Sequence, residues 1–336
     1  MASLSPLSPL SPAACTEVLD THCHLHTGSG QSQMVGAGAV SMAVAESDDW
    51  DMLAEWLESG PDSAAASASA SPWRIGGYGT HPWYATSVVE LPSLRVDDLP
   101  TDATVSAAVA SYIARLGDRL DAAAAAGHTV IVGEIGVDKF RGWHPQAEAD
   151  GEVPDGYAEM SRNGRNRLAF NIAQKPLFEA QFDLAAARGL PVSIHCVQAG
   201  GYLFEFLASA SRRGLVPSGV ALHSVSLKAG LITSLLAIRG PLADVLFFGL
   251  SPAINYSSPR SAKLTDAAIA LIPREQVLLE SDLEEYEANE QAADYTPLVA
   301  ALAVAWDATL AEVIAITSAN ARRWLAGLAP SPVQSC

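Results

Sequence analysis

Apolar and polar residues follow a repeating order along this chain, in which short β-branched runs alternate with longer Ala- and Leu-rich segments. Eight such short runs can be picked out, and several are near-continuous in apolar residues, as expected of strands that are covered on both faces. They occupy residues 17–24, 38–46, 74–81, 129–136, 190–196, 219–225, 244–251 and 277–283. Intervening segments such as 107–127, 176–189 and 229–240 have helical spacing and end on a glycine, a common residue just past a helix C-terminus.

This alternation predicts an α/β fold with a parallel sheet whose strands are joined by crossover helices. Eight repeats favour a (β/α)8 barrel of the TIM type, and an open doubly wound sheet is the alternative. We expect one domain over residues 17–327, between a flexible N-terminal tail (1–16) and a C-terminal tail (328–336). Loop insertions are expected near 61–72, which is rich in Ala and Ser, and at 141–170, which would lie over the barrel mouth.

Charge and cysteine content narrow the function classes. The chain has 37 Asp and Glu against 20 Lys and Arg, a net charge of −17, so its mean field repels phosphate backbones and argues against non-specific nucleic-acid coating. The densest positive cluster is Arg162, Arg165 and Arg167, which is either a solvated loop or a contact for an anionic substrate. Widely spaced cysteines, no apolar run of membrane-spanning length and no signal-like N-terminus predict a cytoplasmic or nuclear protein.

Ionisable residues stand at the ends of the predicted strands, where a barrel would gather them at one mouth. In the stretch DTHCHLH, alternate histidines would share one face of an extended strand. Unpaired imidazoles and carboxylates are costly to bury, and divalent cations would satisfy their lone pairs and charge together. The predicted metal ligands are His22, His24, Glu134, His195, His223 and Asp282.

The residue types indicate the metal and further site residues. Mixed imidazole and carboxylate donors favour zinc, manganese or iron over magnesium, and we expect one or two divalent ions. His81 and Trp83 in GTHPW are predicted to face the pocket and contact substrate, with a packed loop as the alternative. Asp20 and Asp138 are interpreted as supporting or capping groups.

The ordered motifs DTHCHLH, GYGTHPW, VGEIGVDK, LPVSIHC, ALHSVS and LLESDL, with the closing SANARRWL, resemble the TatD-related hydrolases of the metal-dependent amidohydrolase superfamily. The resemblance implies two divalent metal ions at the mouth of a (β/α)8 barrel. His22, His24, Glu134 and Asp282 would hold one ion, and Glu134 would bridge to a second ion held by His195 and His223. Asp282 and Glu134 would be the catalytic residues, with Asp282 taking a proton from the attacking water.

The same resemblance implies hydrolysis of phosphoester bonds, with DNA or a small phosphoester as substrate. The chain departs from the family pattern at His26, where an Asp is usual, at Val197, where an Arg often stands, and in the 141–170 insertion. A metal-dependent hydrolase of a small amide, ester or lactone is one alternative function. A non-catalytic scaffold that keeps the site as a structural metal centre is the other, and the oligomeric state stays open.

Overall fold

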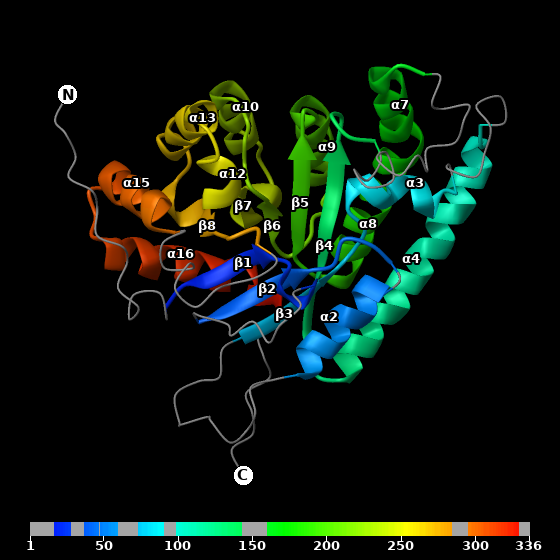
Figure 1. Ribbon diagram of the computed structural model, residues 1–336, viewed down its shortest axis with the longest axis horizontal. Coiled ribbons are helices and arrows are strands. Elements are labelled where there is room, and N and C mark those ends of the chain that lie inside the picture. The colour runs from blue at the N-terminus through cyan, green and yellow to red at the C-terminus, as the bar shows by residue number, and fades with distance from the viewer. Residues whose placement is uncertain are drawn as a thin grey trace, which may run out of the picture.

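The computed structural model describes residues 17–27, 37–46, 48–59, 73–90, 99–142, 160–283 and 295–328. The expected N-terminal tail, the 61–72 loop, residues 143–159 of the insertion and residues 329–336 lie outside this description. Eight strands form one parallel sheet in sequence order (Figure 1). They are β1 (Leu19–Cys23), β2 (Gly38–Met42), β3 (Trp73–Tyr78), β4 (Thr129–Asp138), β5 (Val192–Val197), β6 (Val220–Leu222), β7 (Leu246–Leu250) and β8 (Val277–Leu279).

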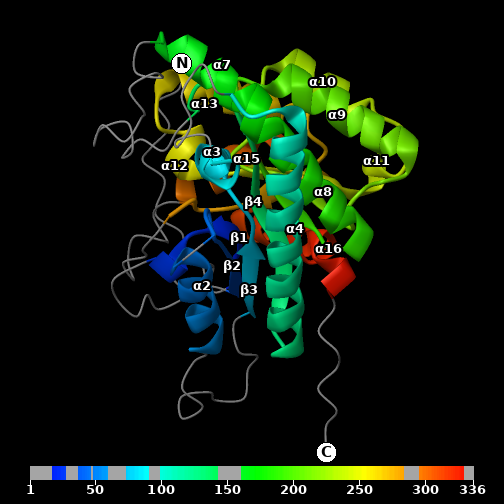
Figure 2. The ribbon, with the colours of Figure 1, turned by 90° about the vertical axis from the view of Figure 1, so that its right-hand side faces the viewer.

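From β2 onward, α-helices connect successive strands and cover the outside of the sheet, as Figure 2 shows for α2, α4 and α8. The longer ones are α2 (Asp48–Glu58), α4 (Asp102–Ala125), α7 (Arg162–Ala169), α8 (Lys175–Arg188), α9 (Gly200–Arg213), α10 (Ala229–Leu236), α13 (Pro259–Ile269), α15 (Thr296–Trp306) and α16 (Leu310–Trp324). The short ones are α3 (Ala85–Val88), α11 (Leu242–Val245) and α12 (Pro252–Asn255). A π-helix, η5 (Phe170–Gln174), joins α7 to α8, and short 3-10 turns are η1 (Leu25–Thr27), η2 (Pro82–Tyr84), η6 (Arg274–Gln276) and η7 (Ala326–Leu328).

The first and last strands meet at a seam that brings the sheet close to a closed ring. The backbone N–H of Asp282 donates to the carbonyl of His22 at 2.9 Å. The buried carboxylate of Asp20 accepts hydrogen bonds from the backbone N–H of Ser281 at 3.0 Å and from its hydroxyl at 2.6 Å. Asp20 is therefore a supporting group, as predicted, and the TIM-type barrel is confirmed.

The barrel interior is filled with apolar side chains at the amino ends of the strands. Trp324 of α16 is fully buried there and closes that end of the barrel. Its strand partners include Leu19, Val40, Ile131 and Leu278. A filled lower interior leaves the opposite mouth, at the carboxyl ends of the strands, as the place for polar chemistry.

The strands stop earlier than most of the apolar runs that predicted them. His24, His81, His223 and Asp282 lie just past the ends of β1, β3, β6 and β8, in the loops of the mouth. Glu134 instead lies within β4, which continues to residue 138. The side chains were correctly grouped by sequence because loops that follow parallel strands open onto the same rim.

Within the described residues, no single helix is long and apolar enough to cross a membrane. Helices α15 and α16 pass that test only as a pair, and they are bent by 97° at the break between them.

Candidate metal centre

The carboxylate of Glu134 is the point on which the predicted ligands converge. The group is almost completely buried, and imidazole nitrogens surround both of its oxygens. The distances to Oε2 are 3.4 Å from His22 Nε2 and 3.8 Å from His24 Nε2. Those to Oε1 are 3.0 Å from His195 Nδ1, 3.6 Å from His81 Nε2 and 3.9 Å from His223 Nε2.

Asp282 completes the group from the β8 side. Its Oδ1 lies 3.6 Å from Nε2 of both His24 and His223, and 3.9 Å from Nε2 of His22. The structure therefore brings together all six of the residues that the sequence selected. Side chains on β1, β4 and β5 and just past the ends of β1, β6 and β8 meet in one small volume.

Two of the imidazoles have their outward nitrogen occupied by the barrel wall. His24 Nδ1 lies 2.8 Å from the carbonyl of Met42, which can only accept, so this nitrogen carries a proton. Nε2 of the neutral ring then offers its lone pair to the centre. His22 Nδ1 lies 2.9 Å from the hydroxyl of Ser193, and this contact likewise leaves His22 Nε2 pointing inward.

Carboxylates lie opposite the outer nitrogens of the other two imidazoles, and sequence analysis missed one of these carboxylates. His223 Nδ1 lies 3.0 Å from Oε1 of Glu280, a buried residue of the LLESDL motif. The only signal for Glu280 was its place directly after β8. His195 Nε2 lies 3.7 Å from Asp138 Oδ2, so Asp138 is a supporting group as predicted. Carboxylates that face the outer nitrogen of a ligand histidine fix its orientation and raise its basicity.

The absence of a side chain at Gly249 leaves room for the Glu280 carboxylate. A Cβ atom added at Gly249 of β7 would lie 2.1 Å from Glu280 Oε2, a separation that no packed side chain tolerates. Gly136 serves β4 in the same way, because a Cβ there would lie 2.0 Å from the carbonyl oxygen of His195. At Gly136 the contact is with the backbone of β5 and at Gly249 it is with the Glu280 carboxylate, so a Cβ added at either position would force its neighbour to shift.

The pKa values of the metal-free centre reflect the crowding of charge. Burial lowers the pKa of His22, and the positive charge of His223 lowers it further; the two rings stack at 3.6 Å between centroids. Burial also acts to lower the pKa of His223, but Asp282 and Glu280 outweigh it and raise the value to about 10. The pKa of His195 is raised to about 9, because hydrogen bonding to Asp138 and Glu134 outweighs burial.

The two carboxylates at the centre are held ionised. Burial acts to raise the pKa of Glu134, yet electrostatic interactions with His81 and His22 and the hydrogen bond from His195 bring it well below its usual value. Burial opposes ionisation of Asp282 as well, but the positive charge of His223 and the hydrogen bond from His24 lower its pKa to about 2. Imidazoles thus neutralise the carboxylates in the absence of a cation.

The donor atoms fit a divalent cation. In three groups of side chains the possible ligand atoms all lie within 4.8 Å of one another: His22 with His24 and Asp282, His81 with Glu134 and His195, and His22 with His223 and Glu280. His22 Nε2 is buried and makes no hydrogen bond within the described residues. Imidazole nitrogens and carboxylate oxygens held at such spacing suit transition metals such as zinc, manganese or iron.

His81 and Trp83, predicted to contact substrate, line one side of this centre. The ring of His81 is buried against Trp83 at 4.7 Å and His195 at 4.4 Å between centroids. The Trp83 indole N–H donates to Asp138 Oδ2 at 2.8 Å, and its side chain is partly exposed. Burial is the largest of the effects that lower the pKa of His81 to about 3, so this ring is neutral.

His26, which departs from the family pattern, faces away from Glu134. Its Nδ1 lies 2.8 Å from the hydroxyl of Ser41 and its Nε2 lies 2.6 Å from Asp49 Oδ1. Asp49 also accepts a hydrogen bond from the backbone N–H of Ala45 at 3.2 Å. His26 therefore joins the loop after β1 to the end of β2 and the start of α2, which agrees with its absence from the predicted ligands.

Strained backbone gathers at the mouth. Gln198, Ser224 and Asp282 follow β5, β6 and β8, and their φ angles are 53°, 41° and 61°. Such left-handed conformations are unfavourable for residues other than glycine and concentrate at functional sites.

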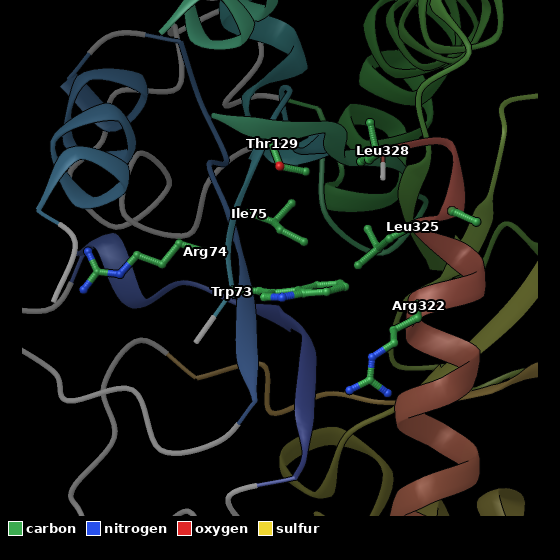
Figure 3. A pocket seen from close by; sticks show the side chains of 8 residues that line it. Trp73, Arg74, Ile75, Thr129, Arg322, Leu325 and Leu328 are labelled. Carbon is green, nitrogen blue, oxygen red and sulfur yellow. The ribbon is translucent and has the colours of Figure 1, made fainter. Parts of the chain in front are cut away.

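A separate cavity of about 370 Å³ lies at the other end of the barrel, between the starts of β3 and β4 and the end of α16 (Figure 3). Trp73, Ile75 and Leu325 form much of its lining, and Arg322 reaches toward the Trp73 ring at 5.9 Å. The described lining contains no histidine or carboxylate. The chemistry therefore belongs to the Glu134 centre rather than to this cavity.

Taken together, the (β/α)8 barrel, the imidazoles and carboxylates at its mouth and a family match over most of the chain indicate a hydrolase with residues suited to hold a divalent metal. Residues 19–326 match the family described as TatD related DNase, and the chain belongs to this family.

Solved structures of the same fold cover almost the whole chain. YjjV, a TatD homolog from Escherichia coli K12, is 18% identical with a TM-score of 0.52, and the match covers 93% of this chain and 99% of that chain. A TatD family hydrolase from Entamoeba histolytica is 12% identical with a TM-score of 0.57, covering 94% and 99%. An uncharacterized amidohydrolase from Saccharomyces cerevisiae is 14% identical with a TM-score of 0.56, covering 92% and 99%. Comparison with curated protein sequences gives no significant match.

Proposed function

We propose that this protein is a metal-dependent phosphodiesterase that cleaves DNA or a small phosphoester. The observation that carries the proposal is the convergence of the imidazoles of His22, His24, His195 and His223 on the Glu134 carboxylate, with the Asp282 carboxylate against three of these rings. The description of the family as TatD related DNase supports a phosphodiester substrate.

Two divalent ions would be held by the predicted ligands, with Glu134 placed between the two sets. His22 and His24 face Oε2 of Glu134, with Asp282 beside these two rings, and His195 and His223 face Oε1. When bound, such ions lower the pKa of a coordinated water and stabilise the charge that develops on phosphoryl oxygens.

The chain's own residues have distinct tasks in this proposal. Asp282 is ionised and carries its carboxylate at the rim, so it can accept the proton of the attacking water. His81, neutral and next to Glu134, can donate a hydrogen bond to a phosphoryl oxygen. Trp83 packs on His81 and can position the leaving group by contact with its face.

Elemental analysis combined with a nuclease assay tests the proposal. Purified protein is expected to contain about two divalent ions per chain, to cleave an oligonucleotide, and to lose cleavage after chelation. Restoring zinc, manganese or magnesium one at a time would identify the active metal. Protein that holds metal but turns over no phosphoester would refute the phosphodiesterase assignment, and inactivity on all substrate classes would favour the scaffold alternative.

Val197 favours a second candidate, the hydrolysis of a small amide, ester or lactone. It ends β5 directly beside the His195 and Cys196 positions, where the family often has an arginine that could hold phosphate. The acidic surface favours an uncharged substrate as well. Parallel assays on oligonucleotides and on a panel of esters and lactones, with the same metal-loaded sample, separate the two candidates.

A further inference from the structure

Three residues directly after β4, which we name the β4 rim (Lys139, Phe140 and Arg141), each take part in a contact between a cation and an aromatic ring. Lys139 and Phe140 are exposed, and Phe140 keeps 45% of its surface open. The three pairs are Lys139 with Phe170 at 4.6 Å, Phe140 with Arg162 at 4.8 Å and Arg141 with Trp83 at 5.2 Å.

The β4 rim adjoins the metal centre through Trp83. The Trp83 ring, on which the Arg141 guanidinium lies, is 4.7 Å from His81 and 6.4 Å from His195 between centroids. Figure 1 shows α7, which carries Arg162, at the same end of the molecule as the arrowheads of β4 and β5. The β4 rim therefore lies on the Trp83 side of the centre.

Two buried amides hold the β4 rim in place. Gln174 of the π-helix accepts a hydrogen bond from the backbone N–H of Asp138 at 2.8 Å and donates to the carbonyl of Arg141 at 3.0 Å. Asn166 of α7 accepts from the backbone N–H of Gly142 at 3.0 Å and donates to the carbonyl of Phe140. The rim is therefore fixed before any ligand arrives, which lowers the entropic cost of binding.

The β4 rim and the residues packed beside it carry positive charge in an acidic chain. The net charge is −17, yet Lys139, Arg141, Arg162 and Lys175 lie together and form no ion pair with any residue that the structure describes. Lys175 lies 4.9 Å from the same Phe170 ring as Lys139. Cations alternating with aromatic rings are the combination that binds single-stranded nucleic acid, because phosphates meet the cations and bases stack on the rings.

We propose that the β4 rim binds the single-stranded polynucleotide next to the bond being cleaved, with Lys139 and Arg141 on phosphates and Phe140 stacked on a base. This inference rests on the proposed phosphodiesterase function and names its substrate class. A duplex hides its base faces, so an exposed Phe140 selects single strands.

Fluorescence anisotropy of metal-loaded protein tests the inference directly. The probe is a labelled phosphorothioate oligothymidylate of about 12 nucleotides, which spans a typical single-strand site and resists hydrolysis. Phe140→Ala should weaken binding roughly 5- to 100-fold with little change in salt dependence, because stacking is lost and charge is kept. The double variant Lys139→Gln with Arg141→Gln should reduce the slope of log affinity against log salt by about 1.4, since each phosphate contact contributes about 0.7 for a single strand.

A matched double variant at the far end of α9, Arg212→Gln with Arg213→Gln, removes the same charge and is expected to leave both affinity and slope unchanged. The sequence that follows the rim, residues 143–159, is acidic. The slope of log affinity against log salt therefore also measures how many rim cations contact phosphate in its presence. Circular dichroism and thermal unfolding check that each variant is folded.

Three results would overturn the inference: equal or tighter binding of the duplex form, no loss of affinity in Phe140→Ala, or the same loss in the α9 control. Equal competition by heparin would assign the rim to polyanions in general and would also overturn it. Since binding is measured without turnover, failure of the rim is distinguishable from failure of the proposed function, which would appear as wild-type protein that cleaves no phosphodiester.

Discussion

Adding one methyl group at Gly249 should weaken metal binding without changing any ligand. In Gly249→Ala the new Cβ would stand 2.1 Å from Oε2 and 2.6 Å from Cδ of Glu280, so the Glu280 carboxylate must move. That carboxylate is buried, accepts a hydrogen bond from the backbone N–H of Ser224, and lies 3.0 Å from His223 Nδ1. Displacing it releases the orientation of the His223 ring.

The expected magnitude follows from the role of such supporting carboxylates. Loss of the group that orients a ligand histidine typically costs 10- to 100-fold in metal affinity, which corresponds to about 1.4–2.7 kcal/mol. Overpacking of the barrel wall should lower the free energy of unfolding of the metal-free protein by about 1–3 kcal/mol. Glu280→Gln, which keeps the volume and removes the charge, should reduce the affinity without the packing loss.

Competition with a chromogenic chelator measures the metal affinity, and urea unfolding of metal-free protein measures the stability. Gly230→Ala is the matched control, because its Cβ would meet no atom within 4 Å on the surface of α10. That control should gain up to about 1 kcal/mol in stability from helix propensity and leave the metal affinity unchanged. A Gly249→Ala variant that is destabilised but binds metal as tightly as wild type would refute the positioning role of Glu280.

Four further predictions concern the centre and its surroundings. Asp282→Asn, which removes the proton acceptor, should reduce hydrolysis by about 10²–10⁴-fold in steady-state assays while the protein stays folded, and full activity in this variant would defeat the assigned mechanism. Metal binding should release protons at neutral pH, because the pKa values of His195 and His223 are raised to about 9 and about 10 and a ligand imidazole must be neutral. Calorimetry in buffers of different ionisation enthalpy would detect this release, and the metal affinity should fall as the pH is lowered. Burial acts to raise the pKa of Asp49, but hydrogen bonding to His26 outweighs burial and lowers this pKa below 3.8. The stability that wild type gains over Asp49→Asn should therefore be present above pH 3.8 and lost as the pH falls through the folded-state pKa. A difference in unfolding free energy that does not change with pH would contradict this prediction. Gln198→Gly should raise the free energy of unfolding by about 0.5–1 kcal/mol, because glycine relieves a left-handed backbone that costs other residues about 1–2 kcal/mol, and a loss of thermal stability would argue against strain at this position.

The fold and the set of converging side chains were predictable from sequence because both depend on periodicity. Near-continuous apolar runs marked the eight strands, and residues at the ends of parallel strands share one rim whatever their distance in sequence. His22 and Asp282 could therefore be grouped without knowledge of any contact.

Contacts that depend on side-chain direction could not be predicted in this way. Glu280 and Asp282 stand two positions apart after β8, yet Glu280 faces the outer nitrogen of His223 and Asp282 faces the centre, partly because Asp282 adopts a positive φ. The pairing of His26 with Asp49 joins segments whose relation depends on how the loop after β1 packs against α2. The π-helix that holds the β4 rim has no periodic signal of its own.

The seam between β1 and β8 has a consequence for how the protein is made. Asp20 and Ser281, which bond to each other there, are separated by 261 positions in the chain. Synthesis proceeds from the N-terminus, so His22 and His24 emerge long before Asp282 exists to complete their set. A nascent chain can thus hold only part of its donor set, and full loading with metal must wait until the last strand has emerged and joined the first.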